Sequence, residues 1–173
     1  MPSKLNFFFI VLLVSQLFIY GYGAKMSALD TKAHQADVLS IDSIIKAIYD
    51  SITFTKGKEP KLDRLRSLFT GNAQFIRITE EGVKTMNLDS FVSSFAERIK
   101  SGKLTSFYEK EVSRKENISE NIAHIFSKYV KCMNKEIPTA ERSGVNSIQL
   151  FYDGKRWWIC SILWEDKPVP SRQ

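Results

Sequence analysis

"GVNSIQLFYDGKRWWICSILWED", residues 144–166, is the stretch that decides the fold. Asp153 and Gly154 at its centre are a strong signal for a tight turn between two antiparallel strands. A strand with one face in water alternates apolar and polar residues, but the second half of this hairpin is apolar on both faces. Both faces must therefore be covered by other protein surfaces.

The expected tight turn pairs Tyr152 with Lys155, and this register sorts the hairpin residues into two sets because side chains alternate along a strand. The first face carries Ile148, Leu150, Trp157, Ile159, Ser161 and Leu163. The second face carries Val145, Ser147, Gln149, Phe151, Trp158, Cys160, Ile162 and Trp164.

Upstream of the hairpin, helical patterns come first and strand patterns follow. Apolar residues recur at helical spacing in residues 36–52, 61–69 and 88–100, and Asn87 is placed to cap the third helix. Residues 73–78 and 83–86 predict a short β pair between the second and third helices. Residues 104–117 and 121–134 predict two longer strands before the hairpin. Helices followed by antiparallel strands indicate an α+β domain with the helices on one face of the sheet.

The amino-terminal segment is typical of a targeting signal. Lys4 precedes a mostly apolar run of 16 residues, 5–20, and small residues follow at Gly21 and Gly23. We predict a signal peptide at residues 1–23, cleaved after Gly23 or Ala24, and an exported, periplasmic or secreted protein with no stable membrane span after processing. A flexible leader (24–35), one domain (36–166) and a tail (167–173) follow. The alternative is an uncleaved anchor, for which the run is short against the roughly 20 residues of a bilayer span.

Composition and motifs argue against several classes of function. The net charge is +6, and the basic cluster at residues 56–66 lacks the aromatic residues of a nucleic-acid surface. Cys132 and Cys160 fall on strands separated by a third strand, too far apart for a disulfide, so we expect two free thiols. No CxxC or HExxH motif occurs, so we expect no metal site and no cofactor.

This order of elements resembles the nuclear transport factor 2-like superfamily, which includes SnoaL-like cyclases, ketosteroid isomerase and scytalone dehydratase. The resemblance is carried by "AIYDSI" (47–52), "LFTGNAQFI" (68–76), "FYEKEV" (107–112), "IAHIFSKY" (122–129) and the final hairpin. The last stretch is most similar to small bacterial members of unassigned function. The resemblance covers residues 37–165, and it is specific for fold rather than for function.

The resemblance implies a cone-shaped, strongly curved antiparallel sheet wrapped around the amino-terminal helices and enclosing a pocket. It places the first face of the hairpin inside the cone and the second face outside, where many relatives dimerise. We therefore expect a homodimer through the outer sheet face, with Phe151, Trp158 and Trp164 near its centre. Inside the cone we expect a ligand-binding set formed by four polar residues, Tyr49, Tyr129, Asn146 and Ser161, and a small apolar ligand.

The family's catalytic residues are not carried over. Residues 73–82 contain no Asp where ketosteroid isomerases have their base, and residues 159–164 contain no His of the SnoaL type. We therefore expect no catalytic residues and a non-catalytic small-molecule or protein-binding module that acts as a homodimer.

The alternative function is an isomerase, dehydratase or cyclase that uses Glu109 or Glu111 with Tyr49 or Tyr129. Such an enzyme needs a carboxylate that points into the cavity beside a Tyr and is not paired with Arg or Lys. A surface position and an ion pair for both glutamates would favour the binding module instead.

Overall fold

The computed structural model describes residues 35–169. The chain divides into two units, Met1–Gln35 and Ala36–Gln173, and the described part covers nearly all of the second. The predicted signal peptide, all of the predicted leader except Gln35, and the last four residues of the predicted tail lie outside the described residues. Export and cleavage therefore remain predictions.

The three predicted helices are present, with changed bounds for the first two. A 3-10 turn η1 (Gln35–Val38) is separated from α2 (Ile41–Ile52), because the Ser40 hydroxyl accepts a hydrogen bond from Ser43 N at 3.1 Å and caps the helix there. The second helix, α3 (Leu62–Arg66), is shorter than predicted, since Phe69 already pairs with a strand. The third, α4 (Leu88–Lys100), begins at the predicted cap Asn87, whose side chain accepts from Ser90 N at 2.8 Å.

The fold class is α+β, as predicted, and the sheet has six strands. They are β1 (Phe69–Thr79), β2 (Gly82–Asn87), β3 (Phe107–Ser119), β4 (Ile122–Met133), β5 (Arg142–Tyr152) and β6 (Trp157–Pro168). Their order is β2-β1-β6-β5-β4-β3, and all neighbours are antiparallel except β1 and β6, which are parallel. The sheet is therefore mixed and open. Cys132 on β4 and Cys160 on β6 are separated by β5, and both thiols are free, as predicted.

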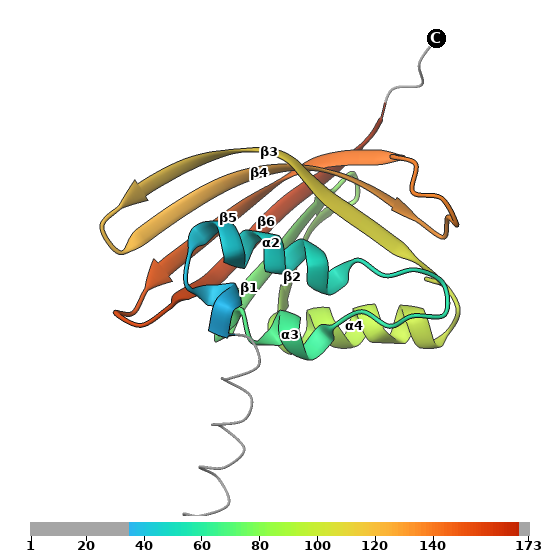
Figure 1. Ribbon diagram of the computed structural model, residues 1–173. Coiled ribbons are helices and arrows are strands. Elements are labelled where there is room, and N and C mark those ends of the chain that lie inside the picture. Colours follow the sequence, from blue (N-terminus) through green and yellow to red (C-terminus); the bar gives the residue numbers. More distant parts are fainter. Residues whose placement is uncertain (1–34, 170–173) are drawn as a thin grey trace, which may run out of the picture. The chain divides into compact units, whose positions relative to one another are not determined.

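The concave side of the sheet holds the helices and the core. Figure 1 shows the sheet bending over α2, with α3 and α4 on the same side. Helix α2 packs on β3, and α4 packs on β1 and β2. Aliphatic side chains from both layers are fully buried, among them Ile44, Ile45, Ile125, Ile148, Leu150 and Ile159. Burial of each such side chain stabilises the fold by about 1.5–3 kcal/mol. No helix among residues 35–169 is long and apolar enough to cross a membrane.

The final hairpin differs from its predicted register in two ways. The turn is longer than expected, so Tyr152 pairs with Trp157 rather than with Lys155. This shift of two residues preserves the alternation of faces, and Leu150 and Ile159 are buried inside as predicted. A bulge then follows, because Leu150 pairs with Ile159 while Gln149 pairs with Ser161. The extra residue, Cys160, reverses the two faces for the rest of β6.

The bulge makes four predicted positions wrong. Ile162 and Trp164, which were expected outside, lie inside: Ile162 is buried, and Trp164 packs against Phe91 with ring centroids 6.1 Å apart. Ser161, which was expected inside, shares the other face with the exposed Gln149 opposite it. Leu163, which was also expected inside, is exposed on that same face. A one-residue slip moves every later side chain to the opposite face of a strand, and the apolar run contains no signal for where the slip occurs.

Candidate functional site

A cavity of about 440 Å³ lies between the concave face of the sheet and the helices. This volume falls in the range of small-molecule sites. Much of its wall is aromatic or aliphatic, contributed mainly by Ile48, Ile52, Phe75, Phe91, Phe95, Ile162 and Trp164. Polar and charged groups interrupt this wall on all six strands and on α4. The cavity therefore combines an apolar wall with charged groups contributed by many elements.

Glu109 on β3 is the buried carboxyl of the cavity wall, with a residue exposure of 9%. The end of α2 fixes its backbone, since the Thr53 hydroxyl donates to the Glu109 carbonyl at 3.1 Å and accepts from its N–H at 3.2 Å. Burial raises the pKa of the Glu109 carboxyl from 4.5 to about 7. The nearby positive charge of Lys131 opposes this rise in pKa, and the negative charge of Asp166 adds to it. A carboxyl with this pKa can both accept and donate a proton near neutral pH.

Asp166, near the end of β6, holds three neighbours together. Its side chain is 3% exposed and accepts from the Tyr129 hydroxyl at 2.6 Å. Lys131 Nζ lies 2.5 Å from the same carboxylate oxygen, and Arg77 Nη2 lies 3.3 Å from the other. Burial alone would raise the pKa of Asp166, but the hydrogen bonds from Lys131 and Tyr129 and the charges of Lys131 and Arg77 lower it below its ordinary value. Asp166 therefore stays ionised and keeps the Lys131 ammonium in place.

Gly144 on β5 makes this arrangement sterically feasible. It pairs with Tyr129 on one side and with Asp166 on the other. A Cβ atom at position 144 would lie 2.3 Å from the Tyr129 hydroxyl oxygen and 2.5 Å from the Glu165 carbonyl oxygen. Such distances are far below van der Waals contact, so only glycine lets Tyr129 cross over β5 to reach Asp166.

A chain of hydrogen bonds leads from the cavity wall through the core. Asn146 Nδ2 donates to the Tyr49 hydroxyl at 3.1 Å, and that hydroxyl lies 2.6 Å from Ser127 Oγ. Ser127 in turn donates to Glu111 at 2.5 Å. Burial raises the pKa of Tyr49, which therefore keeps its proton. Because Ser127 gives its one proton to Glu111, the Tyr49 hydroxyl is the donor in its hydrogen bond with Ser127.

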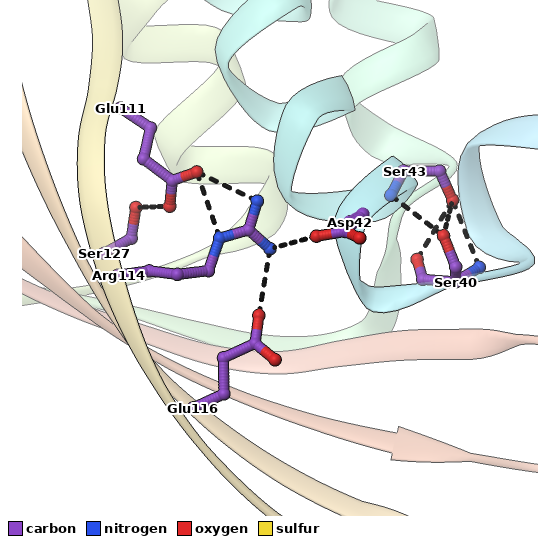
Figure 2. A network of polar contacts seen from close by, with 7 residues as sticks. All are labelled: Ser40, Asp42, Ser43, Glu111, Arg114, Glu116 and Ser127. Atoms are coloured by element: carbon purple, nitrogen blue, oxygen red, sulfur yellow. Dashed lines mark hydrogen bonds and ion pairs between the residues drawn. The ribbon is translucent and has the colours of Figure 1, made fainter.

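Figure 2 shows the outer end of this chain, where Glu111 lies between Ser127 and Arg114. Arg114 contacts Glu111 at 3.0 Å and also reaches Asp42 at 2.9 Å and Glu116 at 3.1 Å. Glu111 is thus engaged by a cation and a hydroxyl. Of the two glutamates considered from the sequence, Glu109 lines the cavity and Glu111 belongs to this ion-pair network.

The four residues of the predicted ligand-binding set occupy three kinds of position. Tyr129 and Asn146 line the cavity. Tyr49 lies behind the wall and reaches it through Asn146. Ser161 is on the opposite face of the sheet, so its predicted place in the cavity is wrong. Whether the other three bind a ligand remains a prediction.

Sequence reasoning missed two central residues, Asp166 and Lys131. Asp166 follows Ile162 and Trp164 at intervals of two, so a correct face for those residues would have placed it inside. Lys131 stands directly opposite Glu109 in the β3–β4 pair, a register that the sequence did not indicate.

No family model and no curated protein matches the sequence, but solved structures do match the fold. A nuclear transport factor 2-like protein of unknown function from Silicibacter pomeroyi is 14% identical, with a TM-score of 0.52 over 79% of this chain and 98% of that one. A candidate dehydratase of the same family from Streptomyces avermitilis is 10% identical, with a TM-score of 0.55 over 76% and 94%. A candidate ketosteroid isomerase from Parabacteroides distasonis is 10% identical, with a TM-score of 0.51 over 79% and 98%.

At these identities the likeness concerns the fold, and it agrees with the curved sheet, the enclosed helices and the cavity described above. The chain therefore has the nuclear transport factor 2-like fold.

Proposed function

We propose that the protein is an enzyme that moves a proton on a small organic molecule held in the cavity, with Glu109 as the general base. The observation that carries this proposal is a buried carboxyl on the cavity wall whose pKa is raised to about 7. A general base works best when its pKa lies near the working pH. A carboxyl with such a pKa lowers the stability of the folded protein at neutral pH. Groups of this kind are concentrated at functional sites, which favours a reactive role for Glu109 over a purely structural one.

The contacts around Glu109 favour the enzyme over the non-catalytic module expected from the sequence. Glu109 faces the cavity beside Tyr129, while Lys131 gives its short ion-pair contact to Asp166. Within residues 35–169, Glu109 makes no ion pair within 4.0 Å, and its hydrogen-bonding neighbour is the neutral Asn146. Tyr129 donates its proton to Asp166, so we assign it a positioning role.

The reaction class that fits is proton removal from a carbon next to a carbonyl group. The Glu109 carboxylate takes the proton, and the electron pair of the C–H bond moves to give an enolate. Lys131 carries ammonium protons beyond the one directed at Asp166, and these can stabilise the negative oxygen. In a substrate with an adjoining C=C bond, the Glu109 carboxyl returns the proton to the far carbon of the dienolate and completes an isomerisation. In a substrate with a hydroxyl group on the next carbon, the Glu109 carboxyl gives its proton to that oxygen, the C–O bond breaks and water leaves, which completes a dehydration.

The test is hydrogen exchange in D₂O, followed by proton NMR, with two carbonyl probes: phenylpyruvate and 1-phenyl-2-propanone. We expect the protein to accelerate exchange of the protons next to the carbonyl group in at least one probe. Glu109→Gln should reduce that acceleration by about 10²–10⁴-fold, the usual loss on removing a general base. Glu136→Gln, at an exposed position after β4, is the matched control. Absence of acceleration with both probes, or an unchanged rate in Glu109→Gln, would overturn the proposal.

We also keep the homodimer as a proposal. Large apolar side chains are exposed on β4, β5 and β6, among them Ile122, Phe126, Val145, Phe151 and Leu163. Ile122 and Phe151 are directly opposite each other on the face away from the helices, and Phe126 and Leu163 both pair with Ser147 on that face, which supports a twofold contact. Trp164 is not part of this surface. Trp158 already donates to Asp153 at 2.8 Å and stacks with Arg156 at 3.6 Å, so we centre the contact on Phe126 and Phe151.

A further inference from the structure

The charged groups that line the cavity are unbalanced. Two are acidic, Glu109 and Asp166. Five are basic: Arg77, Lys84, Arg98, Lys131 and Arg142. The basic groups come from four different strands and from α4, so their convergence on one space is produced by the fold. The cavity therefore has an excess of positive charge whatever the protonation state of Glu109.

Four of the basic residues form two like-charged pairs across neighbouring strands. Arg77 on β1 is directly opposite Lys84 on β2, and Lys131 on β4 is directly opposite Arg142 on β5. Like charges at directly opposite positions destabilise a sheet, because their side chains extend on the same face within a few ångströms. Both pairs line the cavity, which indicates that a negative group belongs between them.

The protein's own carboxylates compensate only part of this charge. Asp166 contacts Arg77 and Lys131, one member of each pair. Among residues 35–169, Lys84 and Arg142 make no ion pair within 4.0 Å. The Nε atoms of Arg77 and Arg142 are buried and make no hydrogen bond within that same part of the chain. A guanidinium N–H that is buried without an acceptor is costly, and a ligand oxygen would relieve that cost.

From this arrangement we infer that the cavity takes an organic anion, a carboxylate with an apolar body. Its carboxylate is bound by the basic groups around Arg142 and Arg77, and its apolar body packs against the aromatic wall formed by Phe75, Phe91 and Trp164. Guanidinium groups bind carboxylates through paired hydrogen bonds. The inference rests on the proposed function, because it names the substrate class for the reaction proposed at the same site. It differs from the small apolar ligand expected from the sequence by adding a carboxylate.

The test compares the binding of three probes to the purified protein by calorimetry: phenylpyruvate, 1-phenyl-2-propanone and inorganic phosphate. The ketone has the carbon skeleton of phenylpyruvate with a methyl group in place of the carboxylate. We expect phenylpyruvate to bind about 10- to 100-fold more tightly than the ketone, as expected for one or more charge-assisted hydrogen bonds. We expect inorganic phosphate to bind more weakly than phenylpyruvate because it has no apolar body.

Substitutions then locate the anion. Arg142→Gln and Lys84→Gln should each weaken phenylpyruvate binding by about 10-fold or more and leave the affinity for the ketone unchanged. The unchanged ketone affinity also shows that the cavity is still folded. Lys128→Gln removes one positive charge from an exposed position on β4 that does not line the cavity, and it should have no effect.

The outcomes separate this inference from the proposed function. The inference of an organic anion would be overturned by any of four results. The ketone or phosphate could bind as tightly as phenylpyruvate, phenylpyruvate could fail to bind, or the Arg142→Gln protein could bind phenylpyruvate as tightly as the wild type does. Exchange of the ketone that depends on Glu109, without a preference for phenylpyruvate, would support the enzyme and refute the anion. Phenylpyruvate binding that depends on Arg142, without any effect of Glu109→Gln on exchange, would support the anion and refute the enzyme.

Discussion

Replacing Glu109 by Gln should change the free energy of unfolding in a pH-dependent way. The difference between the variant and the wild type should favour the variant more at alkaline pH than at acidic pH. The folded protein holds the Glu109 proton more tightly than the unfolded chain does, because burial raises the pKa of this carboxyl from 4.5 to about 7. Between these two pH values the unfolded state binds fewer protons, so the stability of the wild type falls as pH rises. Gln carries no proton to lose, so it removes this dependence.

The expected magnitude follows from the size of the shift. Each tenfold change in proton affinity corresponds to about 1.4 kcal/mol. A shift from 4.5 to about 7 therefore lowers the free energy of unfolding by about 3 kcal/mol once the pH exceeds 7. Below 4.5 the group is protonated in both states and this loss disappears.

The assay is urea unfolding of the wild type, Glu109→Gln and the exposed control Glu136→Gln at about pH 4.5 and about pH 8. The free-energy difference between Glu109→Gln and the wild type should change by about 3 kcal/mol in favour of the variant between these conditions. The control reports the pH response of the rest of the protein. A Glu109→Gln effect that is the same at both pH values would refute the account of a buried carboxyl with a raised pKa.

Three further substitutions test other parts of the structure. Gly144→Ala should destabilise the protein by about 1–3 kcal/mol in chemical denaturation, because its Cβ would collide with Tyr129. Gly71→Ala on β1 is the control, since the space around a Cβ at that position is open. An equal loss of stability at both positions would contradict the reasoning. Ser161→Leu should leave phenylpyruvate affinity unchanged in calorimetry, whereas a large loss would return Ser161 to the cavity. Phe151→Glu should convert the proposed dimer to a folded monomer in sedimentation, and a wild type that is already monomeric at micromolar concentration would exclude the dimer.

Local signals in the sequence predicted most of the fold. The spacing of apolar residues located all three helices, and Asn87 marked the start of α4 by its capping side chain. The start of α2 was placed too early because residues 36–39 continue the helical spacing, while the actual start is set by the cap at Ser40. The parallel pairing of β1 with β6 was not predicted, since it joins segments far apart in the sequence.

The site was harder to predict because it depends on strand register. Glu109 and Glu111 have the same chemistry and lie two residues apart, so the sequence does not separate them. Arg114 separates them in the structure: a register shift follows Glu111 in β3, and beyond it Arg114 reaches Glu111. Asp166 was missed because the bulge at Cys160 reversed the expected faces of β6. The unresolved choice between Glu109 and Glu111 and the missed Asp166 have the same physical origin, which is an extra residue in a strand.

The titration of the Glu109 carboxyl is the measurement that tests the central claim most directly. Carbon-13 NMR of protein labelled in its glutamate side chains, with the Glu109 signal assigned by its absence in Glu109→Gln, gives the pKa of this group. We predict a midpoint near pH 7, which would leave the group able to exchange a proton with a bound molecule at neutral pH. A midpoint near 4.5, the ordinary value for Glu, would contradict the assignment of Glu109 as the base.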